Sequence, residues 1–138
     1  MKRQFCKVKH DPQNGTYGDC LRACVATVLG HDVPHFFEDG CDGETGIQRL
    51  REYLETINLV PLMFSIPGET SKDSVLEFMG VQNPNVTYLL FCKCEGEDHV
   101  VVCRDDAVLF NPAWTPYPVS GVGSSGVWVV MAFVGLIL

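Results

Sequence analysis

The sequence lacks an excess of positive charge. Its 138 residues contain 10 lysine and arginine side chains against 17 aspartate and glutamate side chains, so the formal net charge is −7. A chain of this sign is repelled by phosphate groups instead of attracting them. The composition therefore argues against a non-specific nucleic-acid surface and against binding to an anionic membrane.

The sequence also lacks a long hydrophobic run. The basic segment 1–6 is not followed by the apolar stretch that a secretory signal requires. The apolar run 127–138 has twelve residues, too few to span a bilayer as a helix. Its β-branched content predicts a buried strand, with an interfacial anchor or an oligomer contact as the alternative and its place as an inner or an edge strand left open.

Cysteine, in contrast, is abundant, with seven residues in the chain. Without a secretory signal, the expected environment is a reducing cytosol in which thiols pack as small hydrophobic groups. A set of disulfides would leave one thiol unpaired because the count is odd. We therefore expect free cysteines.

The pattern of apolar residues predicts a single α+β domain over residues 1–138, without repeats or low-complexity segments. Two N-terminal helices are followed by a mostly antiparallel sheet near the C-terminus. The expected helices are 20–29, 45–58 and 71–79, and the expected strands are 4–8, 59–66, 86–92, 99–104, 107–111 and the final apolar run.

Cys20 is the most informative residue. It follows the turn residues Tyr17-Gly18-Asp19 and begins an apolar helix, for which Asp19 is the expected N-cap. A thiol in the first turn of a helix faces unpaired N–H groups and the positive end of the helix dipole. Both lower a thiol pKa, so Cys20 is the predicted nucleophile.

His99 and Asn111 are the predicted partners of Cys20. A hairpin turn at residues 105–106 brings the strands that carry them side by side, so that Asn111 can orient the imidazole. The order Cys, His, Asn along the chain is that of a papain-type hydrolase. Asp106 is the alternative partner of His99 if the hairpin has another register.

An oxyanion site beside Cys20 needs hydrogen-bond donors. We expect the Cys20 N–H to be one of them and the Gln13 side chain to be the other, with Asn14 as the shorter-reaching alternative. The residues that could line the cleft are Tyr17, Asp19, His35 and Trp114. A surface or loop-packing role is the favoured interpretation of His35, and packing in the core is the alternative for Trp114.

These motifs resemble a known family. The run Gly18-Asp19-Cys20-Leu21-Arg22-Ala23-Cys24, the segment 33–36, the run 99–102 and Asn111-Pro112 are similar to the small papain-like cysteine peptidases of bacteria and phages, and in particular to the bacteriocin leader-peptide peptidases. The resemblance covers the chain from about residue 13 onward.

The resemblance implies a papain-like fold and a peptidase that cleaves a peptide or protein through an acyl-thioester on Cys20. It implies no cofactor and a cytoplasmic location in a bacterium or a phage-infected cell. Leu21 stands where the family has Gly, and Asn111 stands where the leader-peptidase branch has Asp. These departures leave amidase or acyl-transfer chemistry open.

Two other interpretations remain. The first is a papain-like binding protein that does not use its triad. The second is a zinc-stabilised module with Cys92, Cys94, His99 and Cys103 as ligands, although Cys-x-Cys spacing on a strand is unusual for zinc. Cys24 is expected in the core, with a role as a resolving thiol for Cys20 as its alternative.

Overall fold

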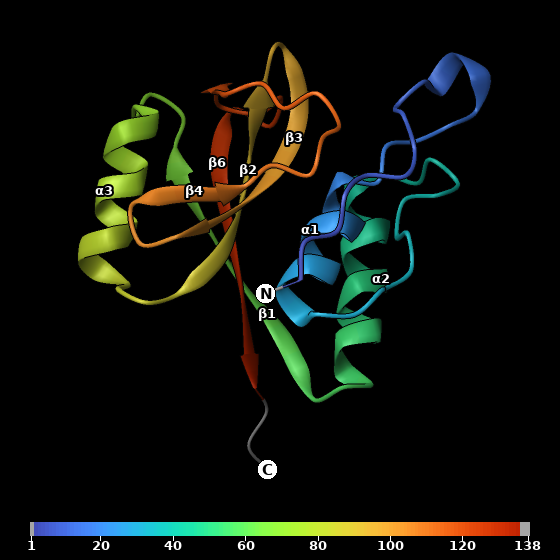
Figure 1. Ribbon diagram of the computed structural model, residues 1–138, viewed down its shortest axis with the longest axis horizontal. Coiled ribbons are helices and arrows are strands. Elements are labelled where there is room, and N and C mark those ends of the chain that lie inside the picture. The colour runs from blue at the N-terminus through green and yellow to red at the C-terminus, as the bar shows by residue number, and fades with distance from the viewer. Residues whose placement is uncertain (1, 136–138) are drawn as a thin grey trace.

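The computed structural model describes residues 2–135, and this part of the chain forms an α+β fold with a six-stranded antiparallel sheet at its centre. The expected fold class is confirmed at this level. In Figure 1, helix α3 lies on one side of the sheet, and α1 and α2 lie on the other. The elements in chain order are η1 (Pro12–Asn14), α1 (Cys20–Leu29), α2 (Gly43–Glu55), β1 (Leu59–Pro67), α3 (Lys72–Gln82), β2 (Thr87–Cys94), β3 (Glu97–Arg104), β4 (Ala107–Phe110), β5 (Val119–Gly121) and β6 (Val127–Gly135).

The strands are arranged in the order β1-β6-β2-β3-β4, and β5 pairs with β2. The last strand is therefore an inner strand, paired with β1 along its whole length and with β2 at Leu89 to Phe91. This position confirms the predicted strand and makes β6 an internal member of the sheet, not an edge. Residues 136–138 of the predicted strand lie outside the described residues.

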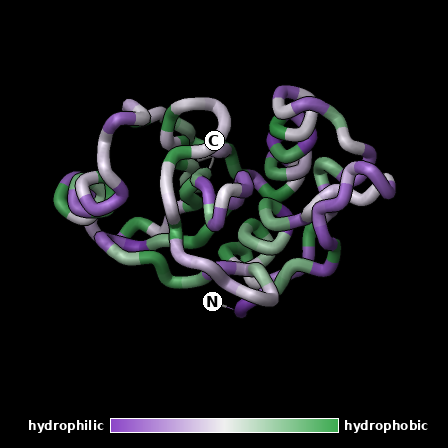
Figure 2. The backbone as a smooth tube through the Cα atoms, turned by 90° about the horizontal axis from the view of Figure 1, so that it is seen from above, coloured by the Kyte–Doolittle hydropathy of each residue, from purple (hydrophilic) through white to green (hydrophobic). Residues whose placement is uncertain are grey.

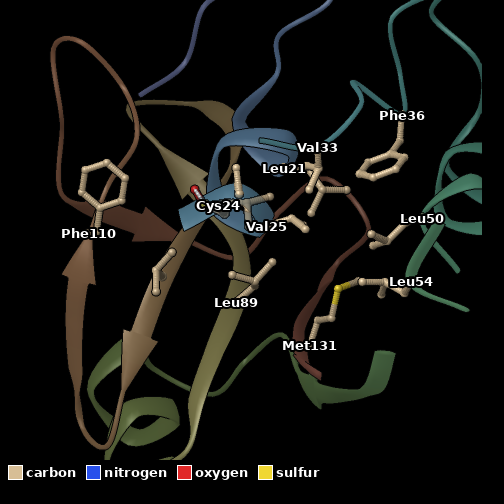
Figure 3. Packing of buried hydrophobic residues seen from close by; sticks show 13 residues of the cluster. Leu21, Cys24, Val25, Val33, Phe36, Leu50, Leu54, Leu89, Phe110 and Met131 are labelled. Atoms are coloured by element: carbon tan, nitrogen blue, oxygen red, sulfur yellow. Dashed lines mark hydrogen bonds between the residues drawn. The ribbon is translucent and has the colours of Figure 1, made fainter. Parts of the chain in front are cut away.

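Two hydrophobic clusters cover the two faces of the sheet. On β3, Val100 and Val102 belong to the cluster beneath α1 and α2, while Val101 and Cys103 belong to the cluster beneath α3. This alternation follows from the two-residue period of a strand. Figure 3 shows Met131 of β6 reaching toward Leu54 of α2 in the first cluster. Figure 2 shows hydrophobic residues gathered toward the middle of the molecule and hydrophilic residues mostly toward its outside.

The helix boundaries follow from local capping. The Asp42 carboxylate accepts a hydrogen bond from the Thr45 N–H at 2.7 Å, so α2 begins before the predicted residue 45. Ser71 caps α3 by accepting the Ser74 N–H at 3.1 Å. This helix continues to Gln82, past the predicted end at residue 79, and Gly80 within it packs closely against Asp106 of the β3–β4 turn.

The predicted strand at residues 4–8 is wrong. These residues, called here the N-terminal strap, give their N–H groups to α1 and to the loop after β4 and not to a sheet. Gln4 N–H donates to Thr27 Oγ1 at 2.8 Å, and Cys6 N–H donates to Pro112 O at 2.9 Å. An apolar pattern alone does not reveal that the acceptors for these N–H groups come from side chains and a loop, and not from a neighbouring strand. Strand β5 was not predicted, because its three residues lie in a Pro/Gly/Ser-rich loop.

Gly68, which follows β1, touches the backbone of the β5–β6 loop. A Cβ added at Gly68 would overlap the carbonyl oxygen of Gly126, and a backbone atom cannot rotate away. We expect Gly68→Ala to lower the free energy of unfolding by about 1–3 kcal/mol, measured by urea denaturation. Gly121→Ala is the matched control because its Cβ would meet no atom within 4 Å. Equal stabilities of the two variants would contradict this contact.

Candidate active site

Helix α1 begins at Cys20, as predicted, but Asp19 does not cap it. No hydrogen bond joins the Asp19 side chain to the first turn of the helix backbone. The carboxylate instead accepts the N–H groups of Lys7 and Val8 in the N-terminal strap, at 3.0–3.1 Å. Asp19 therefore occupies the predicted N-cap position without making the capping hydrogen bond, and its carboxylate, just before the predicted nucleophile, anchors the strap.

Arg22 completes this anchor. Its Nε lies 2.7 Å from Asp19 Oδ2, and the two residues are only 4% and 2% exposed. The same guanidinium donates to Asp32 Oδ1 at 2.8 Å and to Phe5 O at 2.9 Å. Burial alone would raise the pKa of Asp19. The hydrogen bonds from Val8, Arg22 and Lys7 lower this pKa by more than burial raises it, so it lies below the usual value. The carboxylate is ionised and satisfied.

Helix α1 packs its first turn against β3 at the residue next to His99. Cys24 Sγ donates to Val100 O at 3.3 Å, and the Val100 N–H is near enough to Cys20 to lower the pKa of its thiol. Cys20 and Cys24 are one helical turn apart, so both face this stretch of strand. The structure thus places the predicted nucleophile beside the strand of the predicted base.

The pKa of Cys20 does not follow the prediction. Burial raises it, and the N–H groups of Val100, Leu21 and Cys20 itself only partly offset this effect, so the pKa is about 11. The expected lowering is therefore wrong for this structure, because desolvation of the thiolate outweighs the helix terminus. At neutral pH, Cys20 is a neutral thiol.

His99 and Asn111 meet as predicted. Asn111 Oδ1 lies 2.7 Å from His99 Nε2. Two further bonds fix the orientation of the amide, because Asn111 Nδ2 donates to Tyr117 O at 3.0 Å and Oδ1 accepts the Ala113 N–H at 3.1 Å. Oδ1 is therefore the acceptor, and Nε2 carries the proton. In neutral His99, the lone pair is on Nδ1.

The imidazole of His99 is also neutral at pH 7. Burial lowers its pKa, and the hydrogen bond to Asn111 and the charge of Glu97 only partly oppose this effect. Among residues 2–135, no hydrogen bond links His99 Nδ1 to the Cys20 sulfur. The resting site therefore consists of a neutral thiol and a neutral base on adjacent elements, not of an ion pair.

The structure does not bring Gln13 to Cys20. Gln13 is exposed in η1, within the loop that stands out from the body of the molecule in Figure 1. Asn14, the alternative, is hydrogen-bonded to Asp11 Oδ2 at 2.6 Å in the same loop. The first turn of α1 has no side-chain cap, so the N–H groups of Leu21 and Cys20, together with the Val100 N–H, are donors near the thiol.

Tyr17, which precedes α1, and His35, which follows it, are in contact. His35 Nδ1 accepts the Phe37 N–H at 3.3 Å, so Nε2 is the donor to Tyr17 O, at 2.7 Å. The Tyr17 ring covers Gly40, where an added Cβ would overlap it. These contacts hold the backbone that leads into Cys20, which favours the loop-packing interpretation of His35.

Trp114 is not a core residue. It is 76% exposed and stacks on Phe5 of the strap, with ring centroids 5.3 Å apart and an interplanar angle of 18°. Phe5 in turn meets the edge of the Phe110 ring. The strap therefore joins both sides of the site, through Asp19 on α1 and through Trp114 beyond Asn111. This strap was not predicted from the sequence. Two features of the sequence could have indicated it: Phe5, which stacks on Trp114, and Arg22, which follows Asp19 by three residues and pairs with it.

The geometry gives less support to the two alternatives based on cysteine, a zinc site and a role of Cys24 as a resolving thiol. All seven cysteines are free thiols, and Cys24 is fully buried. Within the part of the chain that the structure describes, no three His, Cys, Asp or Glu side chains converge in a way that could hold a metal ion. The Nε2 atom of His99 is occupied by Asn111, which also replaces Asp106 as its partner.

No helix within residues 2–135 has both the length and the apolar character needed to cross a membrane. Comparison of the chain with models of protein families, with curated proteins and with solved structures found no match.

Proposed function

We propose that this protein is a papain-like thiol hydrolase that cleaves peptide or amide bonds with Cys20, His99 and Asn111. The bond of 2.7 Å between His99 Nε2 and Asn111 Oδ1 carries the proposal, because it leaves the Nδ1 lone pair as the base. An orienting amide on one nitrogen and a free lone pair on the other is the arrangement that general-base catalysis by histidine requires, and Cys20 lies beside Val100, the next residue of β3.

The neutral resting state determines how the reaction begins. His99 Nδ1 takes the Cys20 proton as the sulfur attacks the substrate carbonyl carbon, so no thiolate accumulates beforehand. N–H groups of the first turn of α1 stabilise the oxyanion. His99 then gives the proton to the leaving nitrogen as the C–N bond breaks. Water, deprotonated by His99, hydrolyses the thioester and restores the thiol.

The pH dependence of alkylation tests this assignment. Iodoacetamide should modify Cys20 at pH 7 at least about tenfold faster in the native chain than in His99→Ala, because the imidazole accepts the thiol proton. Without His99, the rate should rise only toward the thiol pKa of about 11. Trypsin releases Cys20 in peptide 10–22 and Cys6 in peptide 4–7, so mass spectrometry follows both separately.

Cys6 is the internal control because its pKa is also raised, to about 12, by burial and by the neighbouring Cys20. Its alkylation should not depend on His99. Identical Cys20 profiles in the two proteins would refute the hydrolase. They would favour the second candidate, a binding protein on the same fold, for which the raised pKa of Cys20 is the supporting observation.

A further inference from the structure

An open cavity of about 330 Å³ adjoins Asn111 on the α3 face of the sheet. Its floor is Val101 of β3, which is fully buried, and one wall is Val108 of β4. The other wall is the segment 116–119, which precedes and enters β5. Pockets for small ligands begin at about this size. The cavity is large enough for one bulky side chain and the backbone attached to it.

The cavity opens next to the predicted base. His99 and Val101 are two residues apart on β3, so their side chains lie on the same face of the sheet. Asn111 both binds His99 and lines the cavity. One end of the cavity is therefore Asn111, the residue that binds His99.

The lining combines apolar groups with one cation. Six of the eight lining residues are apolar or aromatic, one is Asn111 and one is Lys72, the first residue of α3. The Lys72 ammonium has a weak partner, because Asp73 lies 3.9 Å away and its side chain is 91% exposed. Such a surface pair contributes little. A ligand carboxylate in the less polar cavity can compete with it.

We propose that this cavity binds the C-terminal residue of a peptide, with its apolar side chain against Val101 and its α-carboxylate on Lys72. This proposal rests on the proposed function, which also determines which part of the substrate lies in the cavity. His99 protonates the leaving nitrogen, so the portion released as an amine lies on the His99 side of the scissile bond. The protein then removes a short C-terminal piece that ends in an apolar residue.

The test uses two probes that differ in one group, N-acetyl-phenylalanine and N-acetyl-phenylalaninamide. Each is titrated into the ¹⁵N-labelled Cys20→Ala chain, and amide chemical shifts report the site of binding. The free acid should shift the signals of Val101, Val108, Tyr117 and Val119 saturably. It should bind about tenfold more tightly than the amide, as expected for one charge-assisted hydrogen bond.

Variants separate the ammonium from the apolar cavity. Lys72→Met should reduce the affinity for the acid to that for the amide, whereas Lys93→Met, which changes a lysine of β2 outside the lining, should not. Asp73→Asn removes the competing carboxylate and should strengthen binding of the acid. Three results would overturn the proposal. The acid and the amide could bind equally well to the chain with an unchanged lining, the chemical-shift changes could be confined to other elements, or no signal could shift saturably.

The binding test does not depend on catalysis. If the acid binds as expected but the native chain hydrolyses no peptide, the hydrolase is refuted and the carboxylate site remains. If the native chain hydrolyses peptides but the acid does not bind in this cavity, the site is refuted and the hydrolase remains.

Discussion

Cys20→Ala is expected to abolish peptide hydrolysis, with a loss of at least about 10⁴-fold in kcat, because no other group replaces the sulfur as nucleophile. His99→Ala should lose about 10²- to 10⁴-fold, the usual contribution of a general acid–base group. Asn111→Ala should lose less, since this residue acts by fixing the ring of His99. The measurement is cleavage of a mixture of synthetic peptides, followed by mass spectrometry.

Cys41→Ala is the matched control, since Cys41 is a partly exposed thiol that precedes α2 and donates to Phe36 O. Its activity should equal that of the native chain. The proposed triad is contradicted if the native chain cleaves peptides and Cys20→Ala cleaves them at the same rate. It is also contradicted if the loss in Asn111→Ala exceeds the loss in His99→Ala.

Arg22→Met is expected to lower the free energy of unfolding by about 3 kcal/mol, because it leaves the buried Asp19 carboxylate without its cation. For a chain of this size, the midpoint of thermal unfolding should fall by roughly 10 °C. Arg49→Met makes the same substitution in an exposed pair with Asp39 and should change stability little. Equal effects in urea denaturation would show that the buried pair does not stabilise the site.

Lowering the pH should reduce the difference in the free energy of unfolding between the native chain and Arg22→Met. The pKa of Asp19 in the folded chain lies below the ordinary value of an aspartate, so its ionised form favours folding. This contribution is complete above about pH 5 and is lost as the pH falls through the folded pKa. The stability difference should therefore be largest near neutral pH and narrow below pH 4. A constant difference from pH 7 to pH 2 would contradict the role of Asp19.

Periodicity in the sequence was enough to predict most of the fold. The apolar stripe of α1 and the alternation of β3 are local patterns, and Gly30 ends α1 in the left-handed conformation that glycine favours, with φ 80°. The N-terminal strap could not be predicted in this way. Its apolar alternation is that of a strand. Its N–H groups, however, are bound by Asp19, Thr27 and Pro112, and no local pattern reports acceptors so distant in the sequence.

The candidate site divides in the same way. The meeting of His99 with Asn111 follows from a hairpin, and a hairpin is readable from local turn residues. The pKa of Cys20 depends on how much of the protein surrounds the sulfur, and no pattern near residue 20 reports that burial. The cavity at Lys72 was missed because its lining comes from α3, β3, β4 and a loop that are separate in the sequence.

The place of β6 in the sheet has a consequence for synthesis on the ribosome. This strand is translated after the other five, yet it lies between β1 and β2. Until residues 127–135 leave the exit tunnel, β1 lacks its only partner strand within the described residues, and one edge of β2 is mostly unpaired. The nascent chain can form α1, α2 and the β2–β3–β4 hairpins, but it cannot close the sheet. Folding is therefore expected to finish late, with a slow step that joins strands about seventy residues apart.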